Sequence, residues 1–156
     1  MGRKEKLRLF LDSDVILSGL FSEKGAPRLI LDLLSLGFPM LKGITGEYNI
    51  MEIERNLHKK LSGALPLYHK YLSVLDLEII PLPPLEEIKR LAGHIADKDI
   101  PVLASAIAAR ADFLITGDKK DFSKGKVKGK YYFQILSPSE FLDIIVPELL
   151  GTQEIE

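Results

Sequence analysis

The feature that most limits the fold of this chain is the form of its short apolar runs. Runs such as Leu7–Leu11 and Phe113–Thr116 are mostly apolar at consecutive positions, without the polar and apolar alternation of a half-exposed strand. Segments with Leu and Ile at helical spacing separate these runs. Strands buried on both faces that alternate with helices indicate a parallel sheet covered on both sides. We therefore predict an α/β fold, a three-layer α/β/α sandwich with a mainly parallel sheet of roughly five strands.

The expected elements follow one another along the whole chain. Strands are predicted at Leu7–Leu11, Met40–Ile44, Leu77–Leu82, Phe113–Thr116 and Tyr132–Leu136. Helices are predicted between Gly25 and Gly37, after a cap at Thr45, and at Leu65–Leu75, Leu85–Gly93, Ile100–Arg110 and Pro138–Leu150. The length of 156 residues suits one domain. We expect residues 1–150 to form it and residues 151–156 to be a C-terminal tail.

Composition excludes several classes of protein. A chain with 46% hydrophobic and 28% charged residues is typical of a globular protein rather than a disordered one. The absence of cysteine excludes disulfides, thiolate zinc sites and a cysteine nucleophile, and it fits a cytoplasmic location. We expect neither a signal peptide nor a membrane span, because no apolar stretch approaches about 20 residues. With a net charge of only −1, nucleic-acid binding would depend on local patches.

Acidic residues gather where the predicted strands end. Asp12 and Asp14 follow the first strand, Asp118 and Asp121 follow the fourth, and Asp99 precedes the helix that leads to the fourth. In open α/β sheets, ligands bind beyond the carboxyl ends of the strands. If the extended path continues past the first strand, its two acids share one face, because they are two residues apart. The pattern predicts a cluster of carboxylates at one end of the sheet.

Such a cluster indicates a cation site. Converging carboxylates repel one another, and oxygen-only ligands suit Mg²⁺ or Mn²⁺. Two such ions about 3.5–4 Å apart can activate water and stabilise the leaving oxygen in phosphodiester hydrolysis. Each acid also has a simpler interpretation: Asp99 as a helix cap, Asp118 as a turn residue, Glu52 and Glu54 as solvated helix positions.

Four segments resemble the PIN-domain family, which includes VapC-like toxin ribonucleases. The segment 9–20, LFLDSDVILSGL, is similar to the opening motif, a strand followed by Asp-Thr-Asn-Val and an apolar stretch. The segment 48–57, YNIMEIERNL, resembles the helix that carries the family glutamate. The segments 97–106, DKDIPVLASA, and 111–122, ADFLITGDKKDF, resemble the third and fourth motifs. The resemblance spans about residues 7–140.

This resemblance implies an endoribonuclease that uses Mg²⁺ or Mn²⁺ to cut single-stranded RNA. The matching positions assign metal binding and catalysis to Asp12, Glu52, Asp99 and Asp118, with support from Asp14, Thr116 and Asp121. Many family members form homodimers, and many are toxins neutralised by an antitoxin protein, so both partners are expected. The RNA target is not implied.

The resemblance leaves two assignments open: the role of Asp14 and the identity of the glutamate ligand on the helix. Asp14 stands where the family commonly has Asn, so it either joins the metal ligands or forms local hydrogen bonds. For the helix ligand, the motif favours Glu52, whereas on a helical wheel Glu54 and Glu47 lie closer to the apolar stripe. We choose Glu52 and keep Glu54 as the alternative.

A lysine-rich stretch follows Asp118 directly. An acidic cleft repels the phosphates of RNA, so cations beside it would hold the backbone. We predict RNA binding by Lys119, Lys120, Lys124, Lys126 and Lys128. The alternative is a solvated loop, the commoner role of a lysine run.

Two other functions remain open. A phosphatase of the haloacid dehalogenase type also places Asp-x-Asp after its first strand, with Asp12 then the covalent nucleophile. Against it, Asp118 and Asp121 are closer together than is usual in that family, and Asp99 would have no role. The other alternative is a PIN scaffold that binds RNA or protein without cutting.

Overall fold

The computed structural model describes residues 6–93, 95–119, 122 and 133–154. Its five strands are β1 (Leu7–Leu11), β2 (Leu41–Gly46), β3 (Glu78–Ile80), β4 (Phe113–Ile115) and β5 (Gln134–Leu136). They form one parallel sheet in the order β3-β2-β1-β4-β5. β1 is central, so Leu9 pairs with Gly43 on one side and with Phe113 on the other. The predicted α/β fold with a parallel sheet is confirmed.

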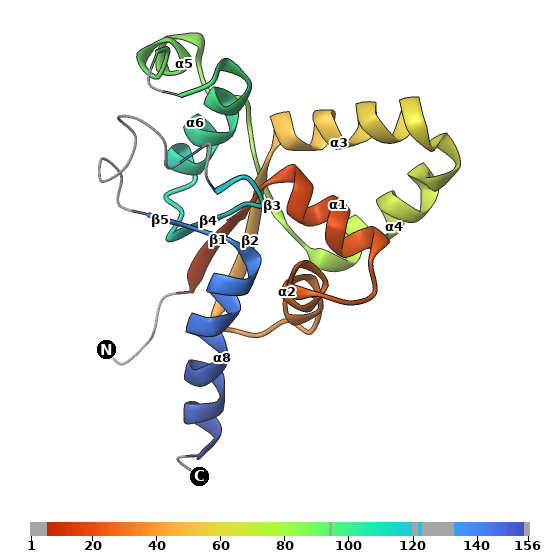
Figure 1. Cartoon of the computed structure of the whole chain (residues 1–156), viewed down its shortest axis with the longest axis vertical. Helices are drawn as coiled ribbons and strands as arrows, with labels where there is room; N and C mark the ends of the chain where they lie inside the picture. Colours follow the sequence, from red (N-terminus) through yellow and green to blue (C-terminus); the bar gives the residue numbers. More distant parts are fainter. Residues whose placement is uncertain (1–5, 94, 120–121, 123–132, 155–156) are drawn as a thin grey trace.

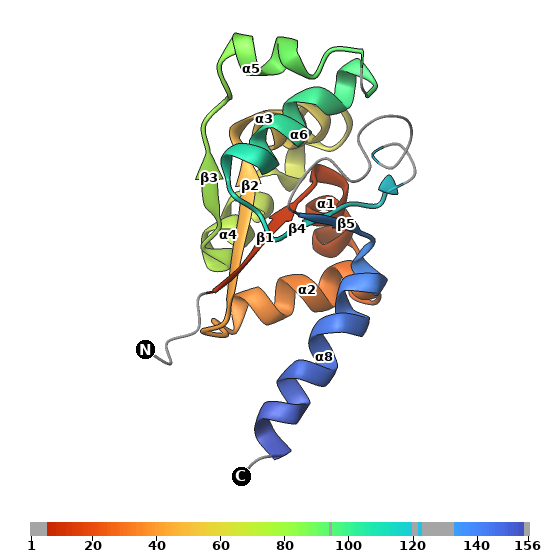
Figure 2. The ribbon, with the colours of Figure 1, turned by 90° about the vertical axis from the view of Figure 1, so that its left-hand side faces the viewer.

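Helices cover both faces of this sheet. They are α1 (Ser13–Phe21), α2 (Ala26–Ser35), α3 (Glu47–Lys60), α4 (Leu65–Leu75), α5 (Leu85–Arg90), α6 (Ile100–Ala108) and α8 (Pro138–Glu154), with short 3-10 turns η1 (Ser62–Ala64) and η2 (Asp97–Asp99). Figures 1 and 2 show α2 and α8 on one side of the sheet, and α5 and α6 on the other.

The core is divided by the sheet into two apolar clusters. The side chains of Leu9 and Leu11 are fully buried in the cluster that includes residues of α1, α2, α4 and α8. Phe10, between them in β1, is fully buried in the cluster that α6 dominates. Successive residues of a strand point to opposite faces. A central strand between two helical layers therefore needs apolar residues at consecutive positions, which explains the run that predicted the fold.

The first helix decides the path of the chain after β1. The shared face considered for Asp12 and Asp14 required the extended path to continue past Leu11, but the chain turns at Asp12 and enters α1, where Asp14 lies in the first turn. The consecutive β-branched residues Val15 and Ile16 resemble strand sequence. They are buried together with Gly19 and Leu20, four residues further on, which is the spacing of one helix face.

Smaller differences lie at the ends of elements. Thr45, expected to cap α3, is inside β2 and donates a hydrogen bond to the carbonyl of Leu11 at 2.8 Å, while Gly46 is the N-cap residue of α3. Helix α8 continues past Leu150 to Glu154, so the helix extends into the expected tail.

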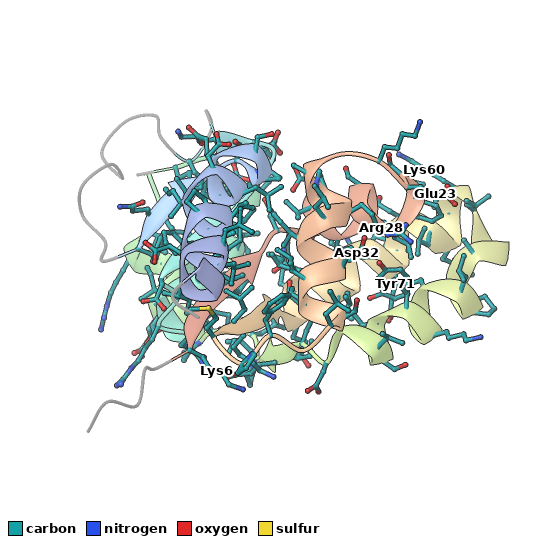
Figure 3. The ribbon with its side chains drawn as sticks, turned by 90° about the horizontal axis from the view of Figure 1, so that it is seen from below. Lys6, Glu23, Arg28, Asp32, Lys60 and Tyr71 are labelled. Atoms are coloured by element: carbon teal, nitrogen blue, oxygen red, sulfur yellow. The ribbon has the colours of Figure 1, made fainter. Side chains whose placement is uncertain are left out.

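One arginine links three helices on the side of the sheet that carries α2. The Nη1 atom of Arg28 in α2 donates to the carbonyl of Gly19 in α1 at 3.2 Å, and its Nε atom lies 3.3 Å from Asp32. Its guanidinium carbon lies 5.4 Å from the ring centroid of Tyr71 in α4. Figure 3 shows these three labelled side chains together between α2 and α4. Arg28 thereby fixes α1, which carries Asp14, against its neighbours.

Candidate active site

A cavity of about 170 Å³ opens where β1 and β4 end. Its lining is dominated by carboxylates that come from distant parts of the chain. The lining residues are Asp12, Ser13, Asp14, Leu17, Glu52, Asn56, Lys98, Asp99, Val102 and Asp118. The structure therefore brings together the four acids predicted as ligands, and places Asp14 beside them.

Asp12 is buried at the floor of this site, with 7% of its surface exposed. Its Oδ1 atom accepts from the backbone N–H of Ser13 at 2.7 Å and from Nδ2 of Asn49 at 3.2 Å. Its Oδ2 atom accepts from the hydroxyl of Thr116 at 2.8 Å. Burial, followed by the charge of Asp14, raises the pKa of Asp12 to about 7 against the stabilising hydrogen bonds. The predicted supporting residue Thr116 contacts Asp12 directly.

Asp14 is tied to the loop after β4. Its Oδ2 atom accepts from the backbone N–H of Gly117 at 2.9 Å. A Cβ atom at position 117 would collide with the same carboxylate, so any other residue there would displace the Asp14 side chain from its present position. Burial and the nearby charge of Asp118 raise the pKa of Asp14. Asp14 is thus part of the acidic site and also forms a local hydrogen bond.

The structure separates the three glutamates of α3. The Oε1 atom of Glu52 accepts from the hydroxyl of Ser13 at 2.7 Å, and Glu52 lines the cavity. Glu54 instead lies 3.2 Å from Nε2 of His69 in α4, and Glu47 accepts from the backbone N–H of Leu82. Neither Glu54 nor Glu47 lines the cavity. The choice of Glu52 on its motif agrees with this placement.

Asp99 and Asp118 complete the lining. Asp99 is 7% exposed at the N-cap position of α6, where its side chain makes no capping hydrogen bond. Its alternative role as a helix cap is therefore not supported. Asp118 is exposed at the rim, and its backbone N–H donates to the hydroxyl of Thr116 at 3.0 Å.

The predicted cationic residues have a different placement. Lys119 lies 2.7 Å from Glu140 of α8 and does not line the cavity. Lys120, Lys124, Lys126, Lys128 and Asp121 lie outside the described residues. Among the described residues that line the cavity, the only cationic one is Lys98, which we did not predict.

Asn49 is a second residue that the sequence did not reveal. It is fully buried on α3 and donates hydrogen bonds to Asp12 and to the hydroxyl of Ser13. It lies on the stripe formed by Ile53 and Leu57, four and eight residues further along the helix. A polar side chain on an otherwise buried apolar stripe was the available signal.

The lining has the donor chemistry of a magnesium or manganese site. All its ionisable acceptors are carboxylate oxygens, and the Oδ1 atom of Asp14 is buried with no hydrogen-bond partner among the described residues. Over the same part of the chain, no three His, Cys, Asp or Glu side chains form a group with ready metal-binding geometry. The side chains thus supply suitable ligands around one cavity without converging on one point.

Comparison with known proteins identifies the family. A PIN-domain family model matches residues 8–120. The chain belongs to the PIN-domain family. PIN domains are generally nucleases. Among curated proteins, none matches the chain.

Solved structures share the PIN fold at low sequence identity. Two contain DNA: VapBC2 from Rickettsia felis bound to a promoter fragment, and VapBC from Salmonella typhimurium. Both have a TM-score of 0.63 and 15% identity, cover 84% and 85% of this chain, and are themselves covered to 98%. A Pyrobaculum aerophilum protein has a TM-score of 0.63 and 17% identity, with 90% of each chain covered. At these identities the likeness shows the fold alone.

Among the helices in the described part of the chain, none is long and apolar enough to cross a membrane.

Proposed function

We propose that this PIN-domain chain is an endoribonuclease that uses Mg²⁺ or Mn²⁺ to hydrolyse phosphodiester bonds in single-stranded RNA. The observation that carries the proposal is the acidic cavity. One space at the carboxyl end of the sheet, where ligands bind in such folds, is lined by carboxylates from five places. They come from the residue after β1, from α1, α3 and η2, and from the loop after β4. Because mutual repulsion disfavours such a cluster, its presence supports a role in binding cations.

Each side chain has a part in this proposal. Asp12, Glu52, Asp99 and Asp118 would hold the ion or ions, with Asp14 as a further candidate ligand. When bound, such an ion supplies a Lewis acid for the phosphate and lowers the pKa of a coordinated water. Thr116 and Asn49 orient the carboxylate of Asp12 through the hydrogen bonds described above. Lys98 offers a positive charge at the lining to attract an RNA phosphate.

The lining of the cavity disfavours the phosphatase alternative. A phosphatase of the haloacid dehalogenase type would use Asp12 as its nucleophile and would have no role for Asp99. Asp99 nevertheless lines the same cavity as Asp12, and the nuclease proposal uses both residues.

The toxin role is a further part of the proposal. The fold likeness to the VapBC structures supports an antitoxin protein as partner, and we propose a homodimer and a cytoplasmic location with it. Co-expression of this chain with the product of an adjacent gene tests the partnership. Suppression of growth arrest together with co-purification would support it, and growth unaffected by this chain alone would contradict it.

Incubation of the pure protein with labelled single-stranded RNA tests the nuclease activity. Cleavage is expected with Mn²⁺, and none with EDTA. Asp12→Asn should abolish cleavage and leave the fold as stable or more stable, because it removes one charge from a repelling cluster. Cleavage in EDTA, or a fully active variant, would contradict the proposal. Wild-type protein that binds RNA without cutting, and gains no stability from Mn²⁺, would instead indicate a scaffold.

A further inference from the structure

We infer that Asn49 is a positioning residue, which fixes Asp12 and Glu52 relative to each other before an ion binds. The inference rests on the proposed metal-dependent function. Asp12 ends β1 and Glu52 belongs to α3, so the backbone alone does not set the distance between their carboxylates. Hydrogen bonds between side chains connect the two carboxylates, and Asn49 is the residue at which the path to Asp12 and the path to Glu52 meet.

Two contacts of Asn49 define this meeting point. Its Nδ2 atom lies 3.2 Å from Oδ1 of Asp12 and 2.9 Å from Oγ of Ser13. The amide nitrogen has two protons, one for each contact. The hydroxyl of Ser13 lies 2.7 Å from Oε1 of Glu52. One amide thus reaches both proposed ligands, the first directly and the second through Ser13.

Hydrogen-bond direction makes this arrangement specific. A serine hydroxyl has a single proton, and a carboxylate can only accept. Ser13 must therefore donate to Glu52 and accept from Asn49. A reversed amide would place its oxygen against the carboxylate of Asp12, which has no proton to offer when ionised. Asp12 therefore requires a donor at Asn49, and the same amide donates to Ser13 while Ser13 donates to Glu52. An apolar residue of similar size supplies neither of the two donors.

A purely structural role does not explain the side chain. Asn49 is fully buried on the stripe of Ile53 and Leu57, where a leucine would extend the core. Its Oδ1 atom is buried with no hydrogen-bond partner among the described residues. An unsatisfied buried acceptor destabilises a fold. An asparagine in this position costs stability and contributes donors only toward the acidic site.

Affinity for Mn²⁺ without RNA tests the inference. Dissociation constants are measured by titration calorimetry, and melting temperatures are measured in EDTA. Asn49→Leu is the main variant, and Asn49→Ala replaces it if the larger side chain prevents folding. Both are expected to bind Mn²⁺ about 10–100-fold more weakly than wild type, the usual effect of removing a partner of a metal ligand. Ser13→Ala breaks only the hydrogen-bond path to Glu52 and should weaken Mn²⁺ binding less than the Asn49 variants do. Ser13→Thr keeps the hydroxyl and should bind Mn²⁺ like wild type.

Ser105→Ala provides the matched control. Ser105 is also fully buried, and its hydroxyl donates to the carbonyl of Pro101 rather than to an acid. This variant should keep the wild-type affinity for Mn²⁺ even if its melting temperature falls. If the Asn49 variants melt lower but bind Mn²⁺ like wild type, the residue is only structural and the inference is wrong. If wild type binds no Mn²⁺, the proposed function fails, and this inference fails with it.

Discussion

At the scale of single residues, Asp12 shows the conflict between burial and charge in this site. A carboxylate that is to hold a cation must be ionised, yet burial and neighbouring acids raise the pKa of Asp12 to about 7. Three hydrogen-bond donors reduce this penalty without removing it. Cation binding should therefore weaken below neutral pH, because the proton competes for the same carboxylate.

The same shift predicts how stability depends on pH in EDTA. In the unfolded chain Asp12 has its ordinary pKa of 3.8, so the folded state binds the proton more tightly. The contribution of Asp12 to the free energy of unfolding is complete below pH 3.8 and is lost as the pH rises to about 7. Its loss is on the order of a few kcal/mol, since one pKa unit corresponds to about 1.4 kcal/mol.

Urea unfolding of wild type and Asp12→Asn at pH 4, 5.5 and 8 measures this effect. The variant should gain stability relative to wild type as the pH rises, because asparagine does not titrate. The difference between the two proteins removes the contributions of acids that do not interact with Asp12. A difference that is the same at all three pH values would show that Asp12 is not buried in a repelling cluster.

Two glutamates of α3 offer a matched pair for the helix ligand. Glu52→Gln should reduce RNA cleavage at least about tenfold by removing a proposed ligand charge. Glu54→Gln should leave cleavage near the wild-type rate, because Glu54 contacts the exposed His69 and not the cavity. Initial rates at saturating Mn²⁺ measure both. Equal losses in the two variants would remove Glu52 from the proposed site.

The acids of the site could be predicted from the sequence because parallel strands bring their carboxyl ends to one edge. The prediction of Asp12, Asp99 and Asp118 therefore required only the strand assignments and a family motif. Asn49 and Lys98 could not be predicted in this way. The one local signal for Asn49 is its polar side chain on an apolar stripe, and that signal does not identify its partners, which lie 36 and 37 residues away in the sequence. The role of Lys98 depends on which face of η2 turns toward the cavity.

At the scale of elements, helix packing decides where Asp14 of α1 lies. Arg28 joins α2 to the carbonyl of Gly19 and to the ring of Tyr71. We expect Arg28→Ala to lower the free energy of unfolding by about 1–2 kcal/mol, since it removes a hydrogen bond and a cation–π contact. Asp32→Ala removes only an exposed pair one helical turn away and should cost about 0.3–0.5 kcal/mol.

Denaturant unfolding of both variants distinguishes the two contacts. If the free energy of unfolding falls by the same amount in both variants, Arg28 stabilises the fold through its ion pair with Asp32 and not through its contacts with α1 and α4.

Most elements followed from periodicity, and the failures have physical causes. The limits of β1 and α4 agree with the predicted ranges, because each has a clear apolar pattern between definite breaks. Helix α1 was missed because its apolar residues follow the strand directly, with β-branched side chains at the junction. The side-chain contact at the turn is the hydrogen bond that the backbone N–H of Ser13 donates to Asp12, and an aspartate alone in a sequence does not predict such a cap.

At the scale of the whole molecule, a chain of net charge −1 must attract RNA with local charge. Lys98→Ala should weaken the binding of single-stranded RNA and lower the slope of log affinity against log salt by about 0.7, the contribution of one phosphate contact. Lys119→Ala should change the slope less, because Lys119 does not line the cavity.

A fluorescent RNA titrated across a salt series measures both lysine variants, with Ca²⁺ present to suppress cutting. A slope unchanged in Lys98→Ala would show that this lysine does not contact the phosphate backbone.

The central position of β1 also determines when the site can exist during synthesis. A ribosome releases Asp12 early, but its partner Thr116 follows 104 residues later, and Asp118 later still. β4 cannot pair with β1 before then, so a nascent chain contains no complete acidic cavity until most of it has been translated. A shortened translation product that stops before β4 would lack Asp118 from the lining and Thr116, the hydrogen-bond partner of Asp12. The proposed ribonuclease site is thus incomplete in an unfinished chain, so by this proposal a nascent chain does not cut the messenger RNA that encodes it.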